Sequence, residues 1–455
     1  MKNKTISGFS RLPKSEKINW VTAQFFQDPI NAENVYKSYI LEDKASQKVF
    51  DGFSENTISN FIVPYGIAPN FIINGQTYAV PMVIEESSVV AAASSAAKFW
   101  MNRGGFKYEI HDIEKLGQLH FFWHGEPALL RSAFDYYLRL ALEKHLEPFT
   151  SNMVKRGGGV RSIELLDKTD EISGFYQLLL RLDTCDSMGA NFTNTLLEEC
   201  LRKLKEVFSS DDRLKNGPQP DFLMAILSNY TPDCRVTASV SCCISQLKGV
   251  SQSLTAEEFA NRFQKAVQIA RIDKYRAVTH NKGIFNGIDA VVLATANDFR
   301  AVEACGHAYA CRDGAYRSLT QCSIENDEFK FWLDIPLALG TVGGLTCLHP
   351  LASSSLELLG KPSARELMGI AACTGLAQNF AAIRSLITTG IQYGHMKMHL
   401  ENILNHLNAS EIESDLASVH FQNSAISFNA VRSFLEDIRC HKQEIRKILK
   451  DPSDV

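Results

Sequence analysis

Lys282 and Asp298 stand out because they frame an almost uncharged segment of the sequence. Residues 283–297 contain one charged side chain, Asp289, and Lys282 lies in a Gly/Asn-rich stretch that predicts a turn. A lysine and an aspartate beside an apolar element lose water, so each needs the other to remain charged. Such a lysine can stabilise negative charge that develops on a substrate oxygen. The alternative is a buried helix with ordinary turn residues at its ends.

His395 and His399 raise the question of a metal site. Two histidines four residues apart share one face of a helix and can bind one ion. The zinc-protease motif needs a glutamate beside the first histidine, where this sequence has Met396 and Lys397. No motif for a third ligand is evident, so we expect no metal.

Residues 275–310 resemble the core of the 3-hydroxy-3-methylglutaryl-coenzyme A (HMG-CoA) reductases, specifically their class II, bacterial and membrane-free form. Further matches occur in chain order at SRLP, VPM–EE–S, DSMGAN, HNKG, ND, GTVGG, GLAQNF and GHM. One departure is Ala296, where the family usually has glycine before Asn-Asp. The resemblance implies reduction of HMG-CoA to mevalonate and CoA with two NAD(P)H, or the reverse reaction.

The resemblance also implies roles for individual residues. Glu86 is the catalytic acid, Lys282 stabilises the oxyanion, Asp298 keeps Lys282 charged, and His395 protonates the CoA thiolate. The implied substrate-binding residues are Ser88, Asn286, Arg276 for the free carboxylate of the glutaryl group, and Arg11 near the CoA phosphates.

The segment DSMGAN follows a predicted strand and precedes a predicted helix, an arrangement that can bind a phosphate. The GxGxxG motif of ordinary Rossmann domains is absent. DSMGAN resembles the segment through which the family binds its dinucleotide. The residues implied to contact the cofactor are therefore Asp186, Met188, Gly189, Ala190 and Asn191.

We predict that the segment around Arg161 and Ser162 determines the cofactor preference. Both residues are therefore added to the predicted cofactor-binding residues. Family members that use NADH have an aspartate in place of Ser162. An acid at that position binds the ribose 2′-hydroxyl and repels a 2′-phosphate, whereas a nearby arginine favours the phosphate. Lys155, Arg156 and Arg161 lie close in sequence, so we expect NADPH to be preferred over NADH. The alternative is that Ser162 merely lies in an exposed strand.

The composition fits a multi-domain globular protein. The 455 residues are 45% hydrophobic and 22% charged, with a formal net charge of −4 and no basic block, so nucleic acid is an unexpected partner. Eleven cysteines without CxxC pairs predict free thiols. The N-terminus lacks a secretory signal, and no apolar run approaches the ~20 residues that span a bilayer. We expect a cytoplasmic protein without membrane contact.

The resemblance implies an α+β fold, with a large helix-rich domain, an inserted small αβ-plait dinucleotide-binding domain and a C-terminal helical flap, and the predicted helices and strands agree with it. Local signals include a hairpin at Asn74-Gly75 and a capped helix from Thr255 whose last turn carries Arg276. The expected boundaries are 1–106 and 233–390 for the large domain, 107–232 for the small domain and 391–455 for the flap. By resemblance, the chain forms at least a homodimer with a site completed across the interface. Two alternatives are a catalytically inactive CoA- or nucleotide-binding regulator and a metal-dependent hydrolase.

Overall fold

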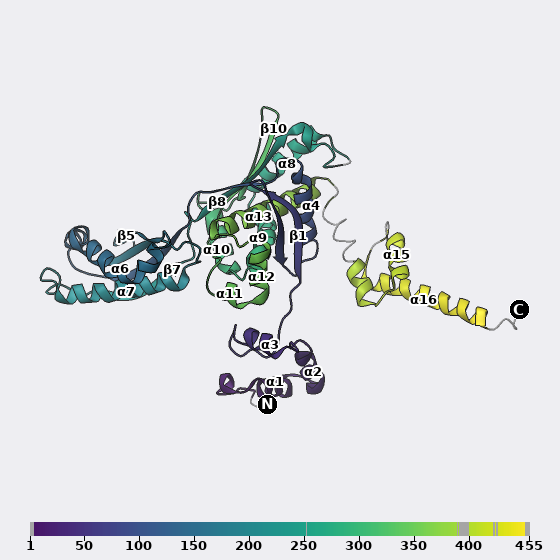
Figure 1. Ribbon diagram of the computed structural model, residues 1–455, viewed down its shortest axis with the longest axis horizontal. Helices are drawn as coiled ribbons and strands as arrows, with labels where there is room; N and C mark the ends of the chain where they lie inside the picture. Colours follow the sequence, from purple (N-terminus) through teal and green to yellow (C-terminus); the bar gives the residue numbers. More distant parts are fainter. Residues whose placement is uncertain are drawn as a thin grey trace.

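The computed structural model describes residues 4–251, 253–388, 390, 400–421, 424 and 426–450. A central body carries a smaller lobe on one side, a group of helices near the N-terminus and another near the C-terminus (Figure 1). This is the predicted α+β fold, in which a helix-rich large part is interrupted by a small sheet domain.

The N-terminal segment is helical, and Figure 1 shows it apart from the central sheet. Its elements are η1 (Phe9–Arg11), α1 (Lys14–Phe25), α2 (Pro29–Ser38) and α3 (Lys44–Asp51). Asp43 caps α3, because its side chain accepts hydrogen bonds from two backbone N–H groups of the first turn. The rings of Phe50 and Phe53 pack against His349 and so connect this segment to the central body.

A β-hairpin and a short helix carry the first site residues. β1 (Tyr65–Ile73) and β2 (Gln76–Val83) pair antiparallel across the predicted turn at Asn74-Gly75. α4 (Val89–Met101) follows and packs on β1 and α13. Its buried residues recur at helical spacing, so the alanine-rich face lies in the core: Val89, Ala93, Ala96, Ala97 and Trp100.

The central sheet has the order β3-β8-β10-β9 and is antiparallel. Its strands are β3 (Lys107–Ile110), β8 (Arg235–Cys243), β9 (Thr320–Glu325) and β10 (Glu328–Pro336), and η3 (Ile244–Leu247) follows β8. Because β3 pairs with β8, residues 107–110 belong to this sheet. The small lobe therefore begins after β3, and the expected boundary at residue 107 is too early.

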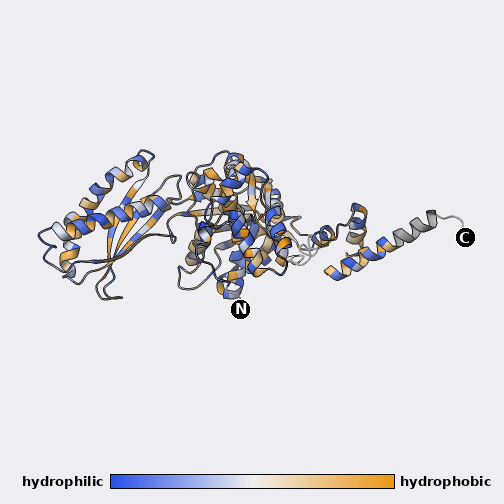
Figure 2. Cartoon of the chain, turned by 90° about the horizontal axis from the view of Figure 1, so that it is seen from below, coloured by the Kyte–Doolittle hydropathy of each residue, from blue (hydrophilic) through white to orange (hydrophobic). Residues whose placement is uncertain are grey.

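The small lobe has the chain order of a split βαβ fold, β-α-β-β-α-β, with an antiparallel sheet ordered β5-β6-β4-β7. Its strands are β4 (Glu114–Phe122), β5 (Gly159–Asp167), β6 (Phe175–Asp183) and β7 (Asp221–Ser228). Its helical segments are α5 (Pro127–Ala133), η2 (Phe134–Leu138), α6 (Arg139–Val154) and α7 (Ala190–Ser210). Figure 2 shows hydrophobic strand residues beside helices that alternate hydrophilic and hydrophobic positions, and the lobe has its own buried core.

The helices of the central body begin with α8 (Ala256–Ile272), opened by the predicted capping box of Thr255 and Glu258. A second helix, α9 (Lys274–Ala294), begins immediately afterwards with Asp273 as its N-cap. Arg276 therefore lies in the first turn of α9, and its predicted place in the last turn of α8 is wrong. α10 (Phe299–Ala310), α11 (Leu345–Leu348) and α12 (Pro350–Leu358) follow along the chain.

The core of the central body is organised around α13 (Ala364–Ile387), which packs against α9, α4 and β8. By length and composition α13 could cross a membrane, but 72% of its most apolar window is buried inside the protein. It is therefore a core helix here. All eleven cysteines are free, as predicted.

The C-terminal helices form a small core of their own. They include α15 (Glu411–His420) and α16 (Phe428–Lys450). The predicted start of the flap at residue 391, together with His395 and His399, lies outside the described residues.

Candidate active site

Glu86, Lys282 and Asn286 converge from two elements that lie far apart in sequence. Glu86 follows β2 in the loop before α4, while Lys282 and Asn286 lie one turn apart on α9. The Lys282 ammonium donates a hydrogen bond to Glu86 Oε2, and Asn286 Nδ2 donates to the same oxygen at 3.3 Å. An acid, a cation and an amide donor therefore surround one point, a combination suited to proton transfer and oxyanion stabilisation.

Ser88 does not cap α4, although a hydroxyl at a helix start usually does so. It occupies the N-cap position with φ 72° and ψ −13°, and its side chain makes no capping hydrogen bond. A left-handed conformation is strained for a residue with a Cβ, and such strain occurs frequently at functional sites. Helix capping therefore does not account for the Ser88 hydroxyl, which lies two residues after Glu86 in the same loop.

Lys282 differs from the sequence expectation in two respects. It lies inside the continuous helix α9, so the predicted turn is wrong. Its side chain is 58% exposed and that of Glu86 is 34% exposed, so the expected loss of water is also absent in the single chain. Of the glycines that suggested a turn, Gly287 has a packing role instead, since a Cβ there would lie 2.7 Å from the carbonyl oxygen of Thr374.

Asp298 contacts neither Lys282 nor Glu86 within the described residues. It caps α10, where Oδ1 accepts the backbone N–H groups of Arg300 at 3.1 Å and Ala301 at 3.2 Å, and it also contacts the Arg300 guanidinium. From Lys282 to the end of α9 the helix rises roughly 18 Å, at about 1.5 Å per residue. The predicted Lys282–Asp298 pair is therefore not formed within one chain.

The turn that carries Asp298 lies next to the segment DSMGAN. The Asn297 side chain bonds both the N–H and the carbonyl of Gly340, at 2.8 and 3.0 Å. A Cβ on Gly340 would lie 2.4 Å from the backbone nitrogen of Met188, so the two loops are in close contact. Ala296, the departure from the family pattern, has φ 53°, a conformation that favours glycine.

Arg276 does not share the face of α9 that carries Lys282. The two residues are six positions apart, which places them about 120° apart around the helix. Burial lowers the pKa of Arg276, and no ion pair to it is found within the described residues. Its charge is therefore partly desolvated and available to an external carboxylate.

The predicted dinucleotide segment connects the small lobe to the central body. Asp186 Oδ1 accepts the first N–H of α13 at 2.8 Å, and the Asp186 carbonyl accepts the N–H of Thr341. Gly189 opens α7 in a left-handed conformation (φ 90°) without a side-chain cap, and a Cβ there would meet Thr184 at 2.5 Å. An N-terminus of a 21-residue helix without a side-chain cap is an arrangement that suits an anion. Asn191 is exposed on the first turn of α7.

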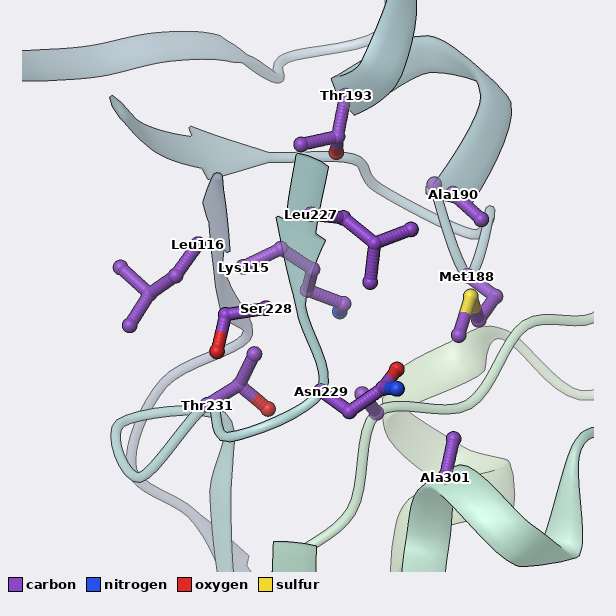
Figure 3. Close-up of a pocket in the computed structure, with 12 residues that line it drawn as sticks. Lys115, Leu116, Met188, Ala190, Thr193, Leu227, Ser228, Asn229, Thr231 and Ala301 are labelled. Atoms are coloured by element: carbon purple, nitrogen blue, oxygen red, sulfur yellow. The ribbon is translucent and has the colours of Figure 1, made fainter. Parts of the chain in front are cut away.

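Met188, Gly189 and Ala190 line a small cavity of about 20 Å³ at the junction of the lobe and the central body, opposite Asn229 (Figure 3). Lys115 from β4 also lines it and is only 4% exposed. Its ammonium donates to the Ile113 carbonyl at 3.0 Å. A buried cation beside an open helix N-terminus makes this junction electrostatically suited to an anionic ligand.

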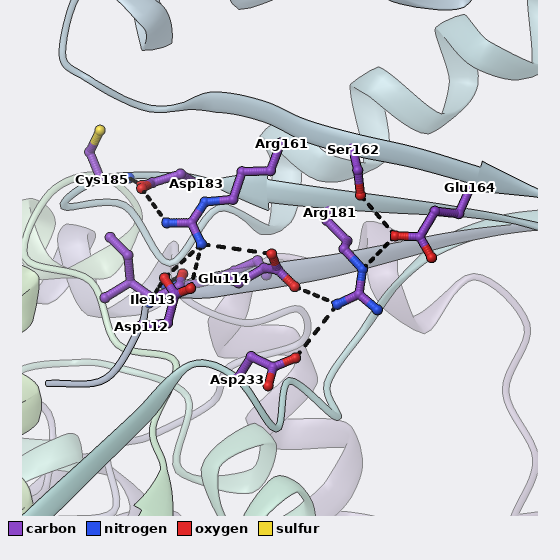
Figure 4. Close-up of polar contacts among 11 residues, drawn as sticks. Asp112, Ile113, Glu114, Arg161, Ser162, Glu164, Arg181, Asp183, Cys185 and Asp233 are labelled. Carbon is purple, nitrogen blue, oxygen red and sulfur yellow. Dashed lines mark hydrogen bonds and ion pairs between the residues drawn. The ribbon is translucent and has the colours of Figure 1, made fainter. Parts of the chain in front are cut away.

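Arg161 and Ser162 take part in a network of charged side chains (Figure 4). Arg161 bonds Asp112 at 2.6 Å and Asp183 at 3.0 Å, and the Ser162 hydroxyl donates to Glu164 at 2.9 Å. Arg181 contacts Glu114, Glu164 and Asp233. Asp112 and Asp233 belong to the two segments that join the lobe to the central sheet. The Arg161 guanidinium is thus paired with carboxylates rather than free for a phosphate.

Another predicted residue, Arg11, is not brought to this centre. Arg11 is exposed at the end of η1, in the N-terminal helical segment that Figure 1 shows apart from α9. His395 lies outside the described residues. Within the described part of the chain, no group of three or more His, Cys, Asp or Glu side chains is placed to hold a metal ion.

The sequence motifs missed several residues of these sites. Lys115, Glu164 and Arg181 lie in strands with ordinary alternation, and nothing in their local spacing distinguishes them. Asp289 did carry a signal, since it is the single charge between residues 283 and 297. Its carboxyl contacts that of Glu303 on α10.

Comparison with known proteins identifies the family of this chain. The family model described as hydroxymethylglutaryl-coenzyme A reductase matches residues 16–400. The HMG-CoA reductase of Archaeoglobus fulgidus is 35% identical over 444 residues, covering 95% of this chain and 94% of that protein. A probable HMG-CoA reductase of Borreliella burgdorferi is 32% identical over 448 residues, covering 97% and 99%. The class II reductase of Streptococcus pneumoniae bound to NADPH has a TM-score of 0.68 and 38% identity, covering 84% of this chain and 100% of that chain.

The chain belongs to the hydroxymethylglutaryl-coenzyme A reductase family, and its fold is similar to that of the class II enzymes. It is therefore an NAD(P)H-dependent oxidoreductase of the mevalonate pathway, as the sequence motifs predicted.

Proposed function

We propose that Glu86, Lys282, Asp298 and His395 carry out the reduction of HMG-CoA to mevalonate and CoA, or its reverse. The contact of Lys282 and Asn286 with the Glu86 carboxylate is the observation that supports this most directly. Lys282 stabilises the oxyanion that forms at the thioester carbonyl and gives a hemithioacetal. His395 protonates the departing CoA thiolate, and Glu86 donates a proton to the aldehyde oxygen of mevaldehyde in the second reduction.

The remaining contacts would orient the substrate. Arg276 binds the free carboxylate of the glutaryl group, because its guanidinium is partly buried and has no ion pair within the described residues. Ser88 and Asn286 contact the substrate beside Glu86, and Arg11 serves the CoA phosphates. The alternative is an inactive CoA- or nucleotide-binding regulator, whose function would not require the Glu86–Lys282 contact. Turnover with HMG-CoA and cofactor separates the two.

Two molecules of the reduced nicotinamide cofactor, bound one after the other, would each supply one hydride. The segment Asp186–Asn191 fits the diphosphate of this cofactor, because the N-terminus of α7 opens at Gly189 without a side-chain cap. Met188, Gly189 and Ala190 line the junction cavity, and Asp186 anchors the loop to α13. In this arrangement Asn191 and the first turn of α7 face the ligand.

We propose that the enzyme prefers NADPH, but that the residues that bind its 2′-phosphate do not include Arg161. Position 162 carries a serine and no acid, while Lys155 and Arg156 are exposed in the turn between α6 and β5. Because Arg161 is paired with Asp112 and Asp183, we assign the 2′-phosphate to Lys155 and Arg156.

The active enzyme would be a homodimer or a higher multiple, in which Asp298 of one copy completes the Glu86–Lys282 site of the other. The roughly 18 Å rise of α9 beyond Lys282 supports this, because it keeps the two residues of one chain apart. α10 runs back beside α9, with His307 packed on Phe285 at 4.8 Å, so Asp298 stays at the far end.

A subunit-mixing experiment tests the shared site. Lys282→Ala and Asp298→Ala homodimers should each be nearly inactive, since loss of a preorganised charge costs about 10²–10³ in rate. After mixed refolding, each hybrid dimer has one site with both residues intact. About one quarter of wild-type activity should return, because half of the dimers are hybrids with one intact site each.

Glu86→Ala mixed with Lys282→Ala is the matched control. Both residues come from one chain, so no hybrid has an intact site and no activity should return. Failure of the Lys282/Asp298 mixture to regain activity, with hybrids verified by mass, would refute the shared site.

We further propose that the enzyme is cytoplasmic and that it uses no metal, membrane or nucleic acid partner. The metal-dependent hydrolase alternative would lose activity on treatment with chelators, whereas the reductase should not. Assays in both directions with each nicotinamide decide whether the enzyme makes or degrades mevalonate.

A further inference from the structure

Lys115 is a buried lysine that has no acid beside it. It is 4% exposed, and its ammonium donates a hydrogen bond to the Ile113 carbonyl at 3.0 Å. Within the described residues it forms no ion pair, and every other residue that lines the junction cavity is uncharged. Burying an ammonium without a counter-ion destabilises a fold, so this placement needs a functional reason.

The acids next to Lys115 in sequence are paired elsewhere. Glu114 and Asp112 contact the arginines of the network in Figure 4. The thiol of Cys234 lies beside the Lys115 ammonium, but burial raises the pKa of Cys234, so the thiol stays neutral. In the described part of the chain, Lys115 therefore has no counter-ion.

The Lys115 side chain lies under the first turn of α7. Side chains of a strand alternate between its two faces, so Lys115 shares the helix-covered face of β4 with Gly117. A Cβ on Gly117 would lie 2.7 Å from Thr193 of α7. Lys115 also lines the junction cavity together with Gly189 and Ala190, where α7 begins (Figure 3). The cation is therefore placed at the positive end of the helix dipole.

This combination of charges is unfavourable until an anion binds. A helix N-terminus favours negative charge, yet α7 has neither a side-chain cap nor an acidic residue in its first turn. Lys115 adds a positive charge where the dipole is already positive. A bound anion would offset the cost of the uncapped N-terminus and of the buried ammonium at once.

We propose that Lys115, together with the N-terminus of α7, supplies the positive charge that binds the diphosphate of the nicotinamide cofactor. The inference rests on the cofactor segment Asp186–Asn191 proposed above. The cavity of about 20 Å³ has room for about one water molecule, so the diphosphate stays outside it. Lys115 therefore acts through its electric field, and equally on NADPH and NADH, because both carry the diphosphate.

Dissociation constants of NADPH and NADH, measured by calorimetric titration of the substrate-free, full-length enzyme, test this role. At a separation of about 10 Å and an effective dielectric constant of about 20, one pair of unit charges changes affinity roughly tenfold. Lys115→Met should therefore raise both constants at least about tenfold and by the same factor. The unfolding temperature without ligand should stay the same or rise, because the substitution removes a buried charge without a counter-ion.

Two further variants control the experiment. Lys168→Met removes a lysine that pairs with Glu171 just after β5, at the end of the sheet far from the pairing of Gly159 with Asp183, and should leave both constants unchanged. Lys115→Gln keeps a donor for the Ile113 carbonyl and should weaken binding as Lys115→Met does. It guards against a folding defect in one variant.

Unchanged constants in the Lys115 variants, or weaker binding of NADPH alone, would overturn the inference. Weaker binding together with a lower unfolding temperature in both Lys115 variants would assign the residue a structural role and overturn it as well. A wild type that binds neither nucleotide would refute the proposed cofactor segment and this inference with it. Turnover of HMG-CoA by the wild type, measured in parallel, tests the proposed reaction separately.

Discussion

Replacing Arg161 with alanine should loosen the small lobe before it changes the choice of cofactor. Arg161 Nη1 lies 2.6 Å from both Asp112 oxygens, and Nη2 lies 3.0 Å from Asp183. Burial alone would raise the pKa of Asp112, but hydrogen bonds led by that from Arg161 hold it below its usual range. Hydrogen bonds to charged groups contribute about 1.5–3 kcal/mol each. The two side chains are 32% and 38% exposed, so screening leaves a cost on the order of 2 kcal/mol.

Urea unfolding and steady-state kinetics together measure this effect. Arg161→Ala should lower the unfolding free energy by about 2 kcal/mol and raise the KM values for NADPH and NADH by a similar factor. Arg156→Ala is the matched control, since it should leave stability unchanged and raise the KM for NADPH alone. An Arg161→Ala enzyme with wild-type stability and a selective loss of NADPH binding would refute the reasoning.

Two further substitutions test local features. Ser162→Asp adds a carboxylate at a position where the hydroxyl now lies 2.9 Å from Glu164. The KM for NADPH should therefore rise about tenfold, and the KM for NADH should change little. A wild-type enzyme that already favours NADH contradicts this prediction. Ala296→Gly should raise the unfolding free energy in urea by about 1 kcal/mol, because φ is 53° there. A less stable glycine variant would show that the strain lies elsewhere.

Local signals in the sequence were sufficient for many elements. Asn74-Gly75 forms its hairpin because the turn needs φ values that these two residues adopt easily. Thr255 and Glu258 form a capping box because both partners lie within one turn of the chain. The family motifs also predicted the acid, the lysine and the dinucleotide loop, and the roles of these residues stay predictions.

The same local reasoning was wrong for α8 and α9. The break at Asp273 has helix-forming residues on both sides and neither glycine nor proline, so sequence periodicity does not show it. The glycines near Lys282 suggested a turn, but Gly287 serves the close packing of α9 on α13. A glycine that permits close approach and a glycine that permits a turn are indistinguishable until the neighbouring helix is known.

The sequence alone determined which residues could do chemistry, and only the tertiary structure decided which of them meet. Glu86 contacts Lys282 across 196 positions because β2 and α9 pack together. Lys282 and Asp298 are close in sequence, yet α9 extends roughly 18 Å beyond Lys282 and keeps the two residues of one chain apart. Arg161 looked like a phosphate ligand, but Asp112 and Asp183 neutralise it. Contacts between elements depend on how the whole chain packs, and spacing along one segment does not contain that information.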